Sequence, residues 1–83
     1  MPLTDRERAL LDFEAAWRRH AGAKEEAIRA ELELSPARYY QLLGRLLETA
    51  EALEYDPMLV KRLRRIRDAR EQARLARASA AGE

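Results

Sequence analysis

The pair Ser35-Pro36 constrains the fold most, because it predicts a helix start only a few residues after an earlier helical segment ends. Serine favours the N-cap of a helix, and proline favours its first turn. On both sides of the pair, apolar residues recur with successive spacings of +4, +2, +5 and +3, at Ile28, Leu32, Leu34, Tyr39 and Leu42. This pattern predicts helices over residues 23–32 and 36–49, joined by a turn of two or three residues.

Two interpretations of this helix pair remain open from its spacing. Two short helices that cross steeply, with Leu34 filling the turn, form a helix-turn-helix. Alternatively, they form a plain helical hairpin in a small bundle. Glu33 occupies a turn position that favours glycine, because glycine adopts the left-handed conformation at little cost. Arg29 stands where alanine would allow close packing.

Two further helices are predicted on either side of this pair. Thr4 and Glu7 form a capping-box pattern at the start of a helix over residues 5–20, for which Gly22 is the predicted C-terminal stop. Asp56-Pro57 starts the last helix. No segment alternates with the period of a β-strand. We therefore predict an all-α fold: a four-helix small domain with a central helix-turn-helix and a basic C-terminal helix.

The apolar stripe of the last helix turns basic along its length. Leu59, Val60, Leu63 and Ile66 are followed at helical spacing by Arg67, Arg70, Arg74 and Arg77. A core cannot bury four unpaired arginines. We therefore expect the helix to leave the core near Ile66. The predicted organisation is one domain over residues 1–78, with a basic arm from about residue 67, and a disordered tail over residues 79–83.

Charge is distributed unevenly, although the net charge is only +1. Residues 1–56 carry a net charge of −4, and residues 57–83 carry +5. A polyanion would meet the basic C-terminal part first. The alternative is that this run is simply a solvated helix face. The predicted DNA-binding residues are Ser35, Arg38, Tyr40, Gln41 and Arg45 in one helix, and Lys61, Arg62, Arg64, Arg65, Arg67, Arg70, Arg74 and Arg77 in the other.

The residue inventory argues against catalysis and metal binding. The chain has no cysteine and only one histidine, so we expect no metal site, no thiol nucleophile and no disulfide. It has no glycine-rich phosphate loop, and we expect no cofactor and no enzymatic activity. No apolar run approaches the length of a membrane span, and acidic residues interrupt the N-terminal region where a signal peptide would be apolar. The expected location is the cytoplasm, at the nucleoid.

Four segments, LLDFEAAW (10–17), HAGAKEEAIR (20–29), LSPARYYQLL (34–43) and YDPMLVKRLRRIRDAR (55–70), together resemble a family of small actinobacterial proteins of uncharacterised function. The family is regarded as helix-turn-helix-like. The resemblance implies an actinobacterial cytoplasm and a four-helix unit with a basic tail, and it supplies no activity or target. Members of this family typically have glycine at the position of Glu33.

The function expected from these features is binding of double-stranded DNA, by a small transcriptional regulator or a nucleoid-associated protein. The alternative is a protein-interaction module that docks on RNA polymerase or a sigma factor, or forms a homodimer, without contacting DNA. An exposed apolar patch near Leu46, Leu47 and Leu53 would support such an interface.

Overall fold

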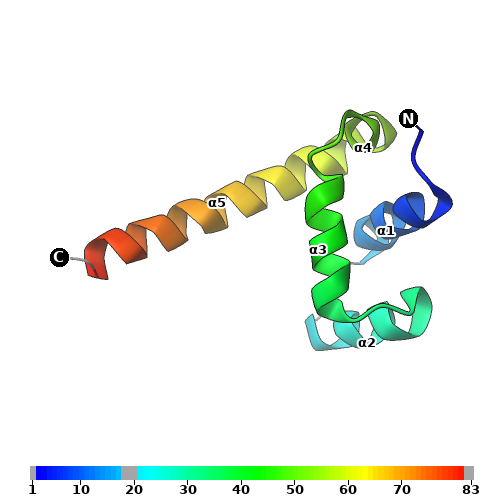
Figure 1. The fold of residues 1–83 in the computed structure, drawn as a ribbon, viewed down its shortest axis with the longest axis horizontal. Coiled ribbons are helices and arrows are strands. Elements are labelled where there is room, and N and C mark those ends of the chain that lie inside the picture. Colours follow the sequence, from blue (N-terminus) through cyan, green and yellow to red (C-terminus); the bar gives the residue numbers. More distant parts are fainter. Residues whose placement is uncertain (1, 18–20, 82–83) are drawn as a thin grey trace.

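The computed structural model describes residues 2–17 and 21–81, and these residues form an all-α domain with no strand, as the sequence predicts. In this described part the chain has five helices where the sequence predicts four (Figure 1). Their bounds are α1 (Asp5–Ala16), α2 (Ala21–Leu32), α3 (Pro36–Leu46), α4 (Ala50–Tyr55) and α5 (Pro57–Ala81).

The predicted helix starts are confirmed where a capping residue marks them. At α1 the Thr4 hydroxyl accepts from the Glu7 amide at 3.1 Å, and the Glu7 carboxylate accepts from the Thr4 amide at 2.8 Å. At α3 the Ser35 hydroxyl accepts from the Arg38 amide at 3.2 Å, and Pro36 is the first helical residue. Each cap satisfies a backbone donor that has no partner within its helix.

The additional helix begins where the sequence predicts the third helix to end. Helix α3 stops at Leu46, and the Thr49 hydroxyl donates to the Leu46 carbonyl at 2.8 Å. The same hydroxyl accepts from the Ala52 amide at 3.1 Å and so caps α4. Thr49 thus bonds a free carbonyl at the end of α3 and caps the start of α4. The prediction of one continuous helix to residue 49 is therefore wrong.

The prediction that Gly22 ends the first helix is also wrong. Helix α1 ends at Ala16 with Trp17 as its C-cap, and α2 already begins at Ala21, so Gly22 lies inside α2. The remaining part of the predicted helix over residues 5–20, including His20, lies outside the described residues.

Helix α3 is the centre of the core, because α1 and α2 both pack against it (Figure 1). Tyr39 is fully buried there, together with Leu11 of α1 and Ile28 of α2. Helix α4 then packs on the beginning of α5, which contributes Leu59 and Val60 to the same core. Leu46 and Leu47 are 3% and 5% exposed. Leu53 is half-buried, so these three residues do not form the exposed apolar patch that would support a protein interface.

The turn between α2 and α3 has a left-handed residue at Glu33, with φ = 54°. This is the position at which glycine is expected from the sequence. Leu34, the next residue, is half-buried and packs against the core. The left-handed conformation costs free energy at Glu33 because this residue has a Cβ, and the short turn forms without a glycine.

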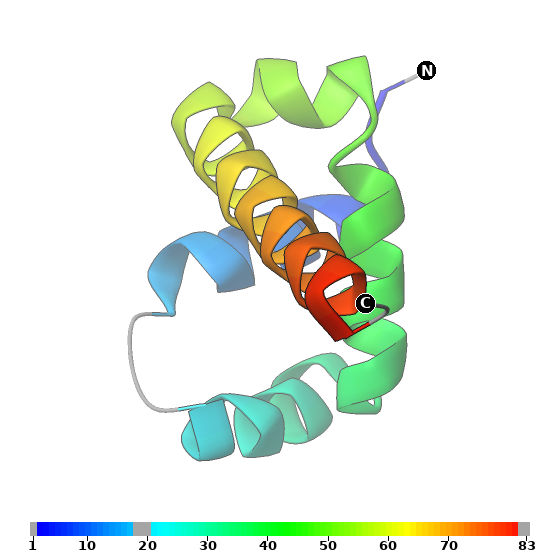
Figure 2. The same cartoon turned by 90° about the vertical axis from the view of Figure 1, so that its left-hand side faces the viewer.

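Helix α5 leaves the core where the sequence predicts. Leu63 and Arg67 are half-buried, and every side chain from residue 68 to residue 80 is exposed. Figure 1 shows α5 extending sideways from the body formed by the other helices, and Figure 2 shows it nearly end-on. Residues 79–81, which the sequence assigns to a disordered tail, are helical, and residues 82–83 lie outside the described residues.

Candidate nucleic-acid interface

The solvent-facing side of α3 carries three of the predicted DNA-contacting side chains. Arg38, Gln41 and Arg45 recur at i, i+3 and i+7, so they lie along one exposed face, opposite the buried Tyr39 and Leu43. The Arg38 guanidinium donates to the Gln41 amide oxygen at 2.6 Å. This pair is held on the surface in a conformation that presents further donors to solvent.

Six of the eight cationic side chains of α5 line one of two depressions. Lys61 and Arg65 are exposed, and they line a shallow depression with Met58 and Arg64. In the described part of the chain, neither Lys61 nor Arg65 forms an ion pair with an acidic side chain. Arg67, Arg70 and Arg74 instead line a groove beneath α5. The exposed Arg77 lies one helical turn further along.

Two predicted phosphate-binding arginines have partners inside the molecule. The Arg64 Nε donates to the Leu47 carbonyl at 2.6 Å, which ties α5 to the end of α3. The Arg67 guanidinium pairs with Glu48 and also donates to Asp68. Burial opposes the charged form of Arg67, but these two carboxylates outweigh it and raise the pKa of the guanidinium. Both arginines therefore hold the junction of α3 and α5 together.

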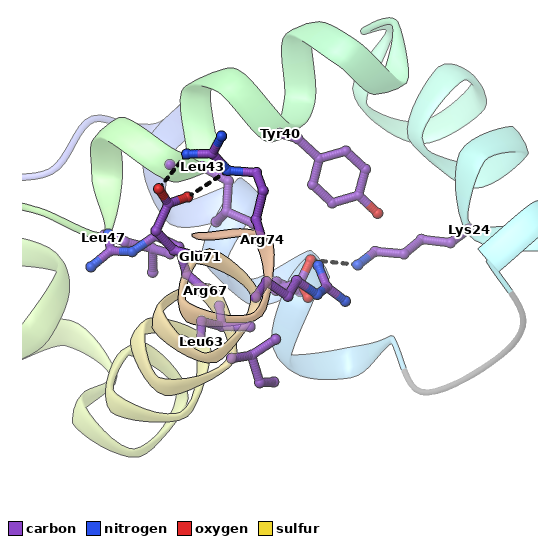
Figure 3. Close-up of a pocket in the computed structure, with 12 residues that line it drawn as sticks. Lys24, Tyr40, Leu43, Leu47, Leu63, Arg67, Glu71 and Arg74 are labelled. Carbon is purple, nitrogen blue, oxygen red and sulfur yellow. Dashed lines mark hydrogen bonds and ion pairs between the residues drawn. The ribbon is translucent and has the colours of Figure 1, made fainter. Parts of the chain in front are cut away.

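The groove beneath α5 has a volume of about 460 Å³ and lies between α5 and the α2–α3 pair (Figure 3). Its apolar floor is formed by Leu43 and Leu47 of α3 and by Leu63 and Ile66 of α5. Tyr40, which is 46% exposed, and Lys24 also line it. The structure thus brings Tyr40 together with Arg67, Arg70 and Arg74.

A cluster of polar side chains at the edge of the groove connects α1, α2 and α3. The Lys24 ammonium lies 2.7 Å from the Glu14 carboxylate, and both side chains are largely buried. The Tyr39 hydroxyl donates to the same carboxylate at 2.5 Å. Lys24 also lies over the rings of Tyr39 and Tyr40, at 5.7 and 5.2 Å from their centroids. Neither Glu14 nor Lys24 is predicted as a site residue from the sequence, although Lys24 lies one helical turn before the buried Ile28.

The predicted site residues do not form one compact surface. Tyr40 lies on the α5 side of α3, whereas Arg45 lines a different depression, with Thr4, Arg6 and Glu7. Ser35 acts as the α3 cap, and the half-buried Arg62 lies near the start of α5. The outer face of α3 and the groove beneath α5 are therefore two separate surfaces that share one helix.

The described residues contain no group of three or more side chains that could hold a metal ion. Among the same residues, no helix is long and apolar enough to cross a membrane.

Comparison of the sequence with known proteins identifies the family to which the chain is related. Neither the curated proteins nor the solved structures include a significant match. Residues 2–75 match the family described as protein of unknown function, DUF3263. This match includes α1 to α4 and most of α5, with both surfaces described above. The chain therefore belongs to the DUF3263 family of proteins of unknown function.

Proposed function

We propose that this protein binds double-stranded DNA without catalysing a reaction, as a small transcriptional regulator or nucleoid-associated protein in the bacterial cytoplasm. The observation that carries the proposal is the outer face of α3. Arg38, Gln41 and Arg45 lie exposed on a helix whose opposite face is anchored by α1 and α2. The short turn through Glu33 supports reading α2 and α3 as a helix-turn-helix.

In this proposal α3 enters the major groove and reads base edges. A recognition helix contacts bases through residues near its N-terminus, and Arg38 and Gln41 lie in the first two turns of α3. Arginine matches the acceptors of guanine, and glutamine matches the donor and acceptor of adenine. The Arg38–Gln41 hydrogen bond orders both side chains before DNA arrives, which lowers the entropy lost on binding.

Helix α5 supplies the sequence-independent part of the affinity. Lys61, Arg65, Arg70 and Arg77 have no ion pair with another side chain in the described part of the chain. They are therefore available for phosphate oxygens, and arginine forms bidentate bonds to them. Arg64 and Arg67, which hold α3 and α5 together, support this surface instead of contacting DNA directly.

The test is fluorescence anisotropy of a labelled mixed-sequence duplex titrated with the protein at several salt concentrations. Affinity should fall steeply with salt, because each neutralised phosphate releases counterions. The Arg65→Ala and Arg70→Ala variants should bind all sequences more weakly, and each should reduce the magnitude of the log–log salt slope by about 0.9. Arg8→Ala is the charge-matched control, because Arg8 lies on α1 and pairs with Asp5.

Selection of preferred duplexes then tests α3. If α3 reads bases, Gln41→Ala should lose about 1–3 kcal/mol of discrimination at one base pair while keeping the salt slope. Uniform weakening in every α3 variant would identify a nucleoid-type protein without sequence preference. An absence of duplex binding at low salt, for both mixed and selected sequences, would refute the proposed function.

A further inference from the structure

We propose that the groove beneath α5 docks an acidic amphipathic helix of a protein partner. The groove is bounded by α3 on one side and α5 on the other, with Lys24 at its far edge (Figure 3), where it pairs with Glu14. Two neighbouring helices leave a channel into which the ridge of a third helix can pack. This surface is distinct from the outer face of α3 and shares only Arg70 with the proposed phosphate-contacting residues, so the inference goes beyond the proposed DNA binding.

The floor of the groove exposes apolar surface that no described part of this chain covers. Ile66 is 41% exposed and Tyr40 is 46% exposed, and both line the groove beside the half-buried Leu63. Gly44 keeps the α3 wall open, because, apart from its chain neighbours and the adjacent helical backbone, no atom of the described residues lies within 4 Å of the position that a Cβ would occupy. Covering such a surface with apolar side chains is favourable in proportion to the area removed from water.

The walls of the groove specify an acidic occupant. Lys24, Arg67, Arg70 and Arg74 line it, against two lining carboxylates, Glu14 and Glu71. Lys24 pairs with Glu14, Arg74 pairs with Glu71 at 2.5 Å, and Arg67 pairs with Glu48 and Asp68. Arg70 has no such partner among the described side chains. The groove therefore keeps a positive charge that a row of glutamates or aspartates complements.

The combination of an apolar floor and cationic walls favours a protein helix over nucleic acid. A duplex presents phosphates to a protein surface and has no aliphatic ridge to cover Leu63 and Ile66. An amphipathic helix presents such a ridge through residues at i, i+4 and i+7, with acidic residues on either side. Its apolar side chains contact the floor, and its carboxylates reach Arg70 and the far edge of the groove.

The probe is a fluorescein-labelled, lactam-stapled peptide of about 15 residues, with leucines at i, i+4 and i+7 and glutamates at most other positions. The full-length protein should raise its anisotropy. A peptide with the leucines replaced by alanine should bind at least about tenfold more weakly, and one with lysines in place of the glutamates should not bind.

Matched variants locate the peptide on the protein. Ile66→Gln should weaken peptide binding about tenfold. Leu75→Gln should have little effect, because Leu75 is 49% exposed on the same helix but does not line the groove. Gly44→Leu, which places a side chain in the open wall of the groove, should also block the peptide. Urea midpoints no lower than that of the wild-type protein would show that these variants remain folded.

Duplex binding separates this inference from the proposed function. Ile66→Gln should leave duplex affinity unchanged, whereas Lys61→Glu with Arg65→Glu should weaken the duplex and spare the peptide. The docking proposal is overturned if the wild-type protein does not bind the acidic peptide, or if Ile66→Gln and Leu75→Gln bind it equally. It is also overturned if a single-stranded oligonucleotide binds in an Ile66-dependent manner while the acidic peptide does not.

Discussion

The Arg64 guanidinium donates a hydrogen bond of 2.6 Å to the backbone carbonyl of Leu47, seventeen residues earlier in the chain. Leu47 is the C-cap of α3, so its carbonyl is among those that have no partner within the helix. A basic side chain near the C-terminal end of a helix also complements its dipole. Arg64 thus satisfies the carbonyl of the α3 C-cap and links α5 to the end of α3.

Replacing Arg64 should therefore destabilise the fold. Arg64→Met keeps most of the aliphatic stem but leaves the Leu47 carbonyl without its donor, which should cost about 1–3 kcal/mol in the free energy of unfolding. Arg65→Met is the control, because Arg65 is exposed, and it should change stability by less than about 0.5 kcal/mol. Urea titration of both variants gives the comparison, and equal midpoints would contradict a structural role for Arg64.

Glu33→Gly should stabilise the protein by about 1 kcal/mol. Glu33 adopts φ = 54°, a left-handed conformation that is costly for any residue with a Cβ and almost free for glycine. The same substitution two residues earlier, Glu31→Gly, should destabilise by about 1 kcal/mol, because Glu31 lies within α2. The midpoint of thermal unfolding should rise for Glu33→Gly and fall for Glu31→Gly. A shift in the same direction for both variants would show that the conformation of Glu33 is not costly.

Gly44→Ala should also stabilise the chain, by about 1 kcal/mol, because Gly44 lies inside α3 and an added Cβ meets no atom within 4 Å. Within the described part of the chain, no backbone from another element therefore comes close enough to require glycine at this position. Denaturant unfolding measures the gain. Gly22→Ala in α2 is a useful comparison, since among the described residues its added Cβ also meets nothing within 4 Å. If Gly44→Ala alone lost stability, the space beside Gly44 would not be open.

Stability should fall as pH rises above about 10. Burial of Tyr39, together with its hydrogen bond to Glu14, raises the pKa of the phenol well above its usual value. The unfolded chain then loses this proton at a lower pH than the folded chain, so alkali favours unfolding. The free energy of unfolding therefore begins to fall near the ordinary pKa of tyrosine and continues to fall as the pH rises further.

Tyr39→Phe should remove this part of the alkaline loss, at a cost of about 1 kcal/mol near neutral pH from the missing hydrogen bond. Tyr55→Phe is the comparison. The bond from Tyr55 to Asp12 also raises the pKa of its phenol, but at an exposed position where solvent weakens the effect. Urea midpoints of both variants and the wild type, measured below and above pH ~10, would test whether Tyr39 causes the alkaline loss of stability. An equally steep loss in Tyr39→Phe and the wild type would exclude Tyr39 as the cause.

The helix starts could be predicted from sequence because caps act over three or four residues. Thr4 with Glu7, and Ser35 with Pro36, carry their signals locally, and the structure confirms both. Helix α4 could not be predicted in this way, since its six residues are too few to establish a period. Gly22 does not mark the end of the first helix, because glycine is tolerated inside a helix as well as after one.

The two surfaces differ in how far the sequence reveals them. Helical spacing alone predicts the exposed row on α3, because positions i, i+3 and i+7 share a face wherever the helix packs. The groove depends on the angle between α3 and α5, which is set by contacts such as Arg64 with Leu47. A basic run therefore suggests phosphate contacts, whereas the structure shows that two of its arginines serve the internal junction.

The length of α5 bears on how quickly the protein finds a charged target. At about 1.5 Å per residue, the exposed part from residue 68 to residue 80 extends roughly 20 Å beyond the core. Charges carried that far out enlarge the distance at which an approaching polyanion is attracted, because screening at physiological salt begins within about 8 Å of each charge. The projecting part of α5 thus increases the distance at which this small protein captures a polyanion. Shortening α5 should lower the association rate with the polyanion by a larger factor than it raises the dissociation rate.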